Sequence, residues 1–236
     1  MSASVLYNSI ENFYKKKIVF LHIPKTSGTT IGEEIFGDFC GHYSLTQLMN
    51  RDKDKKLNSL EKFTIVRNPY FQKVSGFLHT MTNKKSRSIY SEILNEEIPS
   101  NPKSISYEKM IQHFRNFWKN VNENYIKNEC INFDSINSKF DFDPLDHLNY
   151  LYAYDHWLED TFIDYIFKFE DRESINKWVD EKFGAKVKRH RHDSTKMYPK
   201  FNQLNYKDFY NEHTQEIVLK IYRQDFLKYN YSYNID

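Results

Sequence analysis

The sequence predicts an α/β fold with a central, mainly parallel sheet flanked by helices. Short apolar runs at residues 16–23 and 61–67 are each followed by a polar loop and then by a segment with helical character. Successive strand–loop–helix units favour parallel pairing, because a parallel connection needs a crossover that a helix supplies. In such sheets ligands bind beyond the carboxyl ends of the strands.

The first unit begins with KKIVFLHI (16–23), an apolar run bounded by lysines and by Pro24. This pattern is typical of a short buried strand. The stretch TTIGEEIF (29–36) then predicts a helix whose amino end is capped by Thr29 or Thr30.

The second unit and a third strand follow further along the chain. EKFTIVRNPY (61–70) predicts a strand that ends at Arg67 and leads into a helix. FIDYIFKFED (162–171) alternates apolar and polar residues, which predicts a strand. RESINKWVDEKF (172–183) then predicts a helix closed by Gly184.

The remaining segments are mostly helical in character. Apolar residues recur at helical spacing in the middle of the chain and predict a core stripe: Met110, Ile111, Phe114, Phe117 and Trp118. Residues 214–231 predict an amphipathic terminal helix, and residues 86–104, which contain Pro99 and Pro102, predict an exposed excursion.

Composition and charge limit the classes of function. The 236 residues suit a single domain, 1–236, and the net charge of +2 gives no global argument for binding nucleic acid or an anionic membrane. The two cysteines, Cys40 and Cys130, cannot build a disulfide framework or a zinc cluster, and no apolar run is long enough to span a membrane. We therefore expect a cytoplasmic protein with no membrane anchor and no metal.

One loop carries most of the chemical information. FLHIPKTSGTT (20–30) places Lys25 and Gly28 between a strand and a helix, where backbone N–H groups and the helix dipole favour an anion. The pattern is not that of the nucleotide triphosphatase P-loop, because there the lysine follows the glycines and opens the helix. The residues by themselves leave open an anion site or an ordinary turn with a surface lysine.

Several segments together resemble the sulfotransferases that use 3′-phosphoadenosine 5′-phosphosulfate (PAPS), with the carbohydrate enzymes of the heparan 2-O and chondroitin type as the nearest relatives. The resemblance covers most of residues 16–233 in order. It rests on the segments HIPKTSGTT, FTIVRNPYFQKVSGF, DYIFKFED, RHDSTKMY and YRQDFLKYNY. It implies a P-loop-like three-layer fold.

The resemblance also implies which residues bind PAPS and its product, 3′-phosphoadenosine 5′-phosphate (PAP). The first motif implies that the phosphosulfate end is held by Lys25, Thr26, Ser27, Gly28, Thr29 and Thr30. The second implies that Arg67 grips the 3′-phosphate, a task that suits its planar fork, with Ser75 adding a hydroxyl.

The basic stretch KVKRHRHDSTKMYPK (186–200) matches the loop that closes over PAPS in this family. The resemblance implies cofactor contacts from Arg191, Ser194 and Thr195. Family members often have asparagine where this chain has Asp193, and an acid beside a phosphate is unfavourable unless an arginine pairs with it. A solvated surface or a nucleic-acid contact is the other interpretation of such a run.

Sulfonyl transfer to a hydroxyl needs a group that takes the acceptor's proton. A histidine suits this role, because its ordinary pKa lies near neutrality. CGHYSLTQL (40–48) resembles the family segment that carries the base, which implies His42 as catalytic base beside Lys25 on the leaving side. Glu33 is the alternative base, since some relatives use a carboxylate.

The sequence thus predicts a PAPS-dependent sulfotransferase that acts on a hydroxyl of a saccharide or saccharide-like acceptor by in-line displacement, without metal or nucleic acid. A bacterial or viral cytoplasmic origin is favoured over the Golgi lumen. Two alternatives stay open: a nucleotide-dependent phosphotransferase, which requires Mg²⁺, and a non-catalytic module that binds polyanions through residues 186–200.

Overall fold

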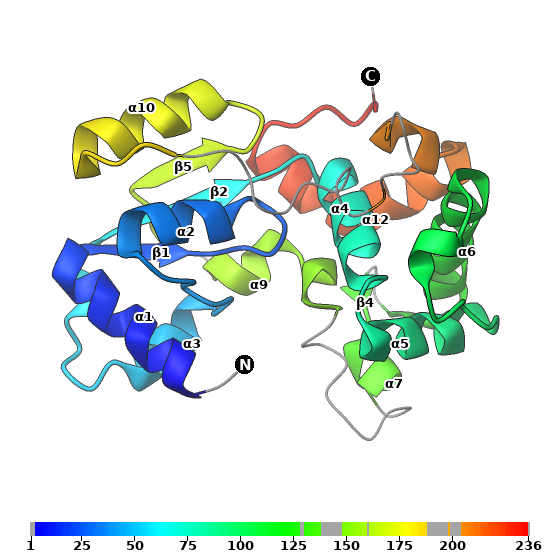
Figure 1. Ribbon diagram of the computed structural model, residues 1–236, viewed down its shortest axis with the longest axis horizontal. Helices are drawn as coiled ribbons and strands as arrows, with labels where there is room; N and C mark the ends of the chain where they lie inside the picture. Colours follow the sequence, from blue (N-terminus) through cyan, green and yellow to red (C-terminus); the bar gives the residue numbers. More distant parts are fainter. Residues whose placement is uncertain are drawn as a thin grey trace. The chain divides into compact units, whose positions relative to one another are not determined.

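The computed structural model describes residues 3–127, 130–137, 148–159, 161–187, 198 and 204–235. The chain divides into two compact units. One comprises residues 1–68 and 152–191, and the other comprises residues 69–151 and 192–236 (Figure 1). A single functional domain over residues 1–236 stays a prediction.

The first unit contains a parallel sheet of three strands in the order β1–β2–β5, which are Ile18–Leu21, Glu61–Val66 and Tyr165–Lys168. Phe20 pairs with Phe63, and Phe63 pairs with Tyr165, so these three side chains share one face of the sheet. The predicted α/β architecture with parallel strands flanked by helices is confirmed for this unit.

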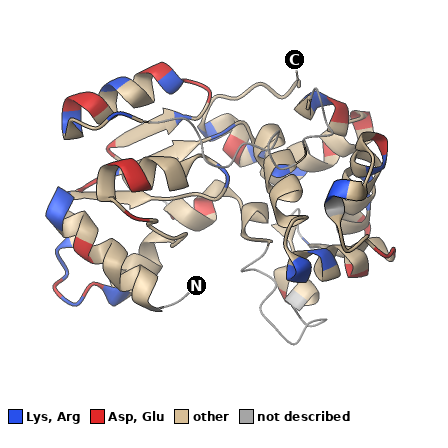
Figure 2. Cartoon of the chain, viewed as in Figure 1, with Lys and Arg blue, Asp and Glu red and all other residues tan. Residues whose placement is uncertain are grey.

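Helix α10 (Arg172–Phe183) packs on that face through Trp178. The ring centroid of Trp178 lies 4.9 Å from those of both Phe63 and Phe167. Acidic and basic residues follow one another along the rest of the helix (Figure 2). Gly184 ends the helix in the left-handed conformation, with φ of 62°, as the sequence predicted.

Further elements complete the first unit: α1 (Ala3–Lys16), α2 (Gly28–Phe36), α3 (Leu45–Arg51), η1 (Leu57–Ser59) and α9 (Tyr154–Leu158). The predicted cap of α2 was wrong. The helix begins at Gly28 with Ser27 as its N-cap, so Thr29 and Thr30 lie within the first turn. The Ser27 backbone adopts a left-handed conformation, which lets the loop enter the helix earlier than the threonine pattern indicated.

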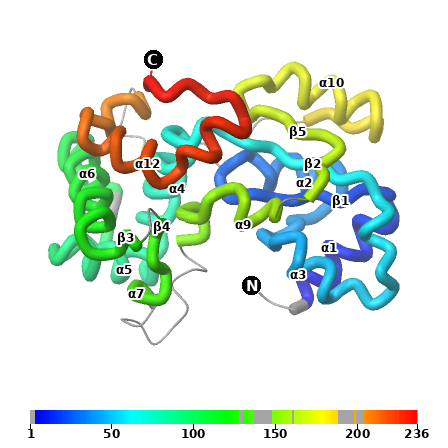
Figure 3. The backbone as a smooth tube through the Cα atoms, turned by 180° about the vertical axis from the view of Figure 1, so that it is seen from behind, coloured from blue at the N-terminus to red at the C-terminus, as the bar shows by residue number. Residues whose placement is uncertain are grey.

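The second unit is mostly helical, and the view from behind shows α4, α5, α6 and α12 grouped within it (Figure 3). Its elements are α4 (Pro69–Thr80), α5 (Lys84–Leu94), η2 (Pro102–Ser104), α6 (Tyr107–Asn124), β3 (Ile126–Lys127), β4 (Cys130–Ile131), α7 (Phe133–Asn137), η3 (Asn149–Leu151), η4 (Tyr206–Phe209) and α12 (Glu212–Lys228). Strands β3 and β4 form a small antiparallel pair. No helix in the described part of the chain is long and apolar enough to cross a bilayer.

Aromatic rings dominate the core of the second unit. The predicted stripe of α6 is largely confirmed, because Phe114, Phe117 and Trp118 are fully buried. Phe77 of α4 packs edge-on against Phe114 at 5.3 Å, and Trp118 meets Tyr222 of α12 at 6.1 Å between ring centroids. Such ring pairs contribute about 0.5–1.5 kcal/mol each beyond the area they bury.

The predicted excursion at residues 86–104 was wrong in its first half. Helix α5 continues to Leu94 and buries Tyr90, whose ring lies 5.0 Å from Phe117 between centroids. The exposed part is the stretch around Pro99. The charged and serine-rich sequence of α5 concealed its apolar stripe.

Candidate active site

The loop after β1 is strained in a way that is common at functional sites. Lys25 and Ser27 both adopt left-handed backbone conformations, with φ of 67° and 76°. Non-glycine residues in such regions cost on the order of 1–3 kcal/mol each and persist where the surroundings impose them. Thr26, between them, is fully buried, and its hydroxyl donates to the carbonyl of Ile23 at 2.8 Å.

The amino end of α2 presents backbone N–H groups next to this loop. The Ser27 side chain does not cap the helix. The N–H groups of the first turn have no carbonyl partner within the helix, and the helix dipole makes this end positive. The loop therefore has the features of an anion site.

Gly28 is required by the close approach of His22. A Cβ at position 28 would lie 1.8 Å from Cδ2 of the His22 ring, far inside van der Waals contact. His22 itself is buried and stacks on Phe20 with 5.3 Å between ring centroids. The ring of His22 therefore fixes the path of the loop where α2 begins.

The two cationic residues of this unit that were predicted to bind anions, Lys25 and Arg67, come together. Arg67 follows β2 and is buried, and its Nη1 donates to the backbone carbonyl of Lys25 at 3.3 Å. The Arg67 guanidinium lies 4.1 Å from the ring centroid of Phe169. Burial, with a smaller contribution from the charge of Arg67, lowers the pKa of Lys25 to about 7. Two neighbouring cationic side chains that are both largely shielded from solvent are typical of a site that binds anions.

His42 lies beside the same loop. Its Nδ1 is 2.9 Å from the backbone carbonyl of His22, and the two imidazole ring centroids are 4.1 Å apart. Burial and, to a smaller extent, the charge of Lys25 lower the pKa of His42 to about 4, although the bond to the His22 carbonyl opposes this shift. His42 is therefore neutral at pH 7.

The hydrogen bond of His42 fixes its tautomer. A carbonyl oxygen can only accept, so Nδ1 carries the proton and donates it to the His22 carbonyl. The lone pair then resides on Nε2. A neutral imidazole in this tautomer can accept a proton at Nε2.

Sequence reasoning missed Arg172, the first residue of α10. Its Nη1 donates to Oγ of Ser27 at 3.2 Å, and its guanidinium lies 3.6 Å from the ring centroid of Phe169. Ser27 and Arg172 are 145 residues apart in the chain. The sequence nevertheless contained a signal for Arg172, because this arginine lies at a predicted strand-to-helix junction, as Arg67 does.

The other predicted site residues lie elsewhere or outside the described chain. Glu33 is on α2 and partly exposed. Ser75 is buried on α4, in the second unit. The three residues of the predicted closing loop lie outside the described residues: Arg191, Ser194 and Thr195.

Comparison with known proteins decides the family. A family model described as the sulfotransferase family matches residues 13–232. The chain belongs to the sulfotransferase family. The family indicated by the motifs, which includes the heparan and chondroitin types, is thereby confirmed, and membership supports sulfate transfer as the general activity. No curated protein and no solved structure matches the sulfotransferase chain.

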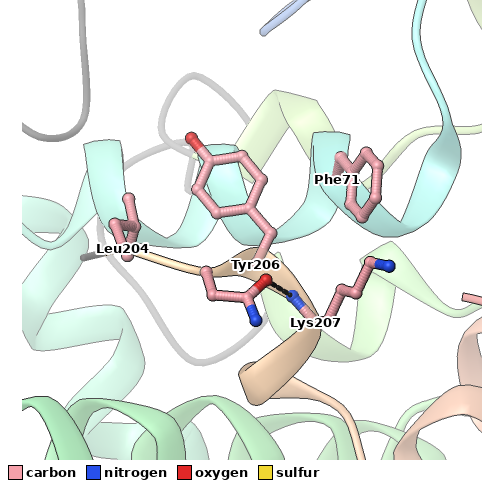
Figure 4. Close-up of a pocket in the computed structure, with 5 residues that line it drawn as sticks. Phe71, Leu204, Tyr206 and Lys207 are labelled. Carbon is pink, nitrogen blue, oxygen red and sulfur yellow. Dashed lines mark hydrogen bonds between the residues drawn. The ribbon is translucent and has the colours of Figure 1, made fainter. Parts of the chain in front are cut away.

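The second unit of this sulfotransferase has a pocket of about 330 Å³. Phe71, at the start of α4, and Tyr206 face it with ring centroids 6.1 Å apart (Figure 4). Lys207 adds a cationic side chain, and its backbone N–H donates to Oδ1 of Asn205 at 3.1 Å. Leu204 completes the lining.

In the described part of this sulfotransferase, no group of three or more His, Cys, Asp or Glu side chains is arranged to hold a metal ion. Independence from metal stays a prediction. Cys40 is buried and Cys130 is exposed, and both are free thiols.

Proposed function

We propose that this sulfotransferase moves the sulfonyl group of PAPS to a hydroxyl of a saccharide or saccharide-like acceptor. The observation that carries the proposal is the contact of Arg67, which follows β2, with Lys25 in the strained loop after β1, at the carboxyl ends of two parallel strands. Family membership over residues 13–232 supports it. PAPS has anionic groups at two ends, and a protein that binds it needs cations and N–H donors for both.

The loop fits an anionic ligand. Burial and the charge of Arg67 lower the pKa of both Lys25 and Arg172, and a bound phosphate would relieve that repulsion. We assign the phosphosulfate end to Lys25, to the N–H groups of the loop and of the first turn of α2, and to the hydroxyls of Ser27, Thr29 and Thr30. Thr26 contributes its N–H, since its hydroxyl already donates to Ile23.

We assign the 3′-phosphate to Arg67 and Ser75, and the closing contacts to Arg191, Ser194 and Thr195. When bound, PAPS supplies an activated sulfonyl group with adenosine bisphosphate as its leaving group. Lys25 favours its charged form as an anion approaches, because a nearby negative charge raises the pKa of an amine. The resulting ammonium stabilises negative charge that grows on the leaving phosphate.

On the acceptor side, His42 removes the hydroxyl proton. Its neutral state and its tautomer, which leaves the lone pair on Nε2, suit this role. A base with a pKa near 4 is weak, but negative charge from a bound nucleotide would raise the pKa of His42 toward neutrality. Glu33 stays the alternative base.

A thermal-shift panel tests the proposed function against the two alternatives. We expect PAP to raise the melting temperature without added metal, because a ligand that binds only the native state stabilises it. A phosphotransferase would instead respond most to ATP with Mg²⁺. A polyanion-binding module would respond to heparin in a salt-dependent way and would show no preference for PAP.

Arg67→Ala should weaken PAP binding by about 1.5–3 kcal/mol, the size of a lost charge-assisted hydrogen bond. Titration calorimetry on purified, folded variant and wild type measures the difference. Arg115→Ala is a matched control, since Arg115 lies in the second unit and donates to a backbone carbonyl of that same unit. Unchanged affinity in Arg67→Ala would contradict the 3′-phosphate assignment.

Gly28→Ala should abolish measurable PAP binding, because its methyl group would overlap the His22 ring and displace the loop. Gly37→Ala is the control. Gly37 ends the same helix with φ of 79°, and a methyl group there would meet no described atom within 4 Å, so its replacement strains the backbone without touching the loop. Both variants are compared by calorimetry and by circular dichroism. Equal binding by the two variants would contradict the role given to the loop.

A further inference from the structure

Arg172 is placed where a ligand of the loop would lie, yet no motif of the sequence accounts for it. It begins α10, directly beyond the carboxyl end of β5. Ligands of parallel α/β sheets bind at this edge. Its guanidinium donates to Ser27 Oγ at 3.2 Å, within the loop that carries Lys25. One of the five N–H groups of its guanidinium makes this bond, so other N–H groups of the same guanidinium can donate to a ligand.

Phe169 holds two guanidinium groups at once. Cζ of Arg172 lies 3.6 Å from the centroid of this ring, and Cζ of Arg67 lies 4.1 Å from it. Contact with the ring fixes the orientation of each fork and lowers the entropy that a ligand contact would otherwise cost. Each guanidinium group is thus oriented in advance for recognition of an oxyanion.

A bound negative charge would stabilise the two neighbouring positive charges of Arg67 and Arg172. Burial, followed by the charge of Arg67, lowers the pKa of Arg172 to about 10, and the nearby Glu170 opposes this shift only in part. The charge of Arg67 also contributes, after burial, to the lowered pKa of Lys25. Glu170 also accepts a hydrogen bond from the backbone N–H of Asn68 at 2.9 Å. Negative charge bound at this cluster would relieve the repulsion of Arg67 with Lys25 and with Arg172.

We propose that Arg172 is a nucleotide-binding residue that grips the 5′-phosphate group of the donor, on the same side as Lys25. The bond from Arg172 to Ser27 assigns it to this end, because Ser27 belongs to the loop of the 5′-phosphosulfate motif. Arg67 serves the 3′-phosphate. This inference rests on the proposed function, and it adds a charged contact from the third strand-to-helix junction.

The test compares three nucleotides: PAP, adenosine 5′-monophosphate and adenosine 3′-monophosphate. Arg172→Gln should weaken binding of PAP and of the 5′-monophosphate about 10- to 100-fold, the range for a lost charge-assisted contact. Binding of the 3′-monophosphate should change less than about twofold. Arg172→Lys, which keeps the charge without the fork, should recover part of the loss. Affinities come from calorimetry, with circular dichroism to verify folding.

Two further variants separate direct binding from a structural role. Ser27→Ala removes the bond to Arg172 but leaves its charge, so it should cost PAP affinity less than Arg172→Gln does. Lys177→Gln removes a cation from an exposed position on the same helix, where Lys177 faces Glu181 at 3.9 Å, and should leave all three affinities unchanged.

The possible failures are distinguishable. A wild-type protein that binds neither PAP nor the 5′-monophosphate would overturn the proposed function, and this inference with it. Wild-type binding that Arg172→Gln retains in full would overturn the inference alone. Equal losses for the 5′- and 3′-monophosphates would contradict the assignment to the 5′ end, and a loss in Ser27→Ala as large as in Arg172→Gln would make Arg172 a support of the loop.

Discussion

Replacing His42 with alanine should slow sulfonyl transfer about 10²- to 10⁴-fold, the usual contribution of a positioned general base. PAP affinity should stay close to that of wild type, because His42 is assigned to neither phosphate. Its Nδ1–H is held by the His22 carbonyl, so the ring presents Nε2 as the proton acceptor. Single-turnover transfer and PAP calorimetry on the folded variant measure the two quantities.

Glu33→Gln is the control, since it keeps the shape of the alternative base and removes its charge. Near-normal transfer by His42→Ala with collapse in Glu33→Gln would give the role to Glu33. Loss of PAP binding in His42→Ala would make His42 a structural residue of the loop.

The wild-type rate should also fall as the pH drops through the pKa of His42, because protonated imidazole cannot accept a proton. Without ligand that pKa is lowered to about 4. A bound nucleotide raises it, so the acidic limb of the rate profile should lie above about pH 4 and below about pH 6.5.

Lys25→Ala should lower turnover about 10²- to 10³-fold, as expected when one group that stabilises developing charge is removed. PAP affinity should fall by a smaller factor, because the ammonium acts most strongly on the charge that grows on the leaving phosphate. Pre-steady-state transfer separates chemistry from product release, and calorimetry gives the affinity. A drop in affinity as large as the drop in rate would contradict this division of roles.

The same lysine should make PAP binding depend on pH. Lys25 has a pKa of about 7 without ligand, so it is largely charged below pH 7 and loses its proton above it. PAP affinity should therefore decrease as the pH rises from about 7 to about 9, and binding in that range should take up a proton. Lys25→Ala should lose this dependence, which calorimetry in buffers of different ionisation enthalpy detects.

The parts of the fold that have local signals were predictable from the sequence. The strands are short apolar runs between polar residues, and α10 carries its own stop signal at Gly184. Helix α5 was not recognised, because Ser and Lys residues and the prolines after it outweighed the spacing of Ile89, Tyr90 and Ile93. Its burial comes from packing on α6, which is a tertiary effect.

The positions of candidate site residues were predictable where a motif is contiguous, and their roles stay predictions. Lys25 and Arg67 each lie in a strand-end motif, and the topology of a parallel sheet brings such ends together. Arg172 was missed because its partner Ser27 lies far away in the chain. The tautomer of His42 depends on a backbone carbonyl, which no residue pattern reveals.

His22 bears on the length of the chain between the Lys25 loop and His42, the proposed base. Its ring sets the position of Gly28, and its carbonyl holds His42, so both ends of the intervening segment are tied to one residue at the end of β1. The distance between the Lys25 loop and His42 is then set by His22 and not by the number of residues that connect them. Extra residues at the exposed Gly37 and Asp38 would add only a small closure entropy, about 0.6 kcal/mol per doubling of the loop. This turn is therefore a place where insertions can accumulate during evolution, or be engineered to reach new acceptors, without resetting the geometry of transfer.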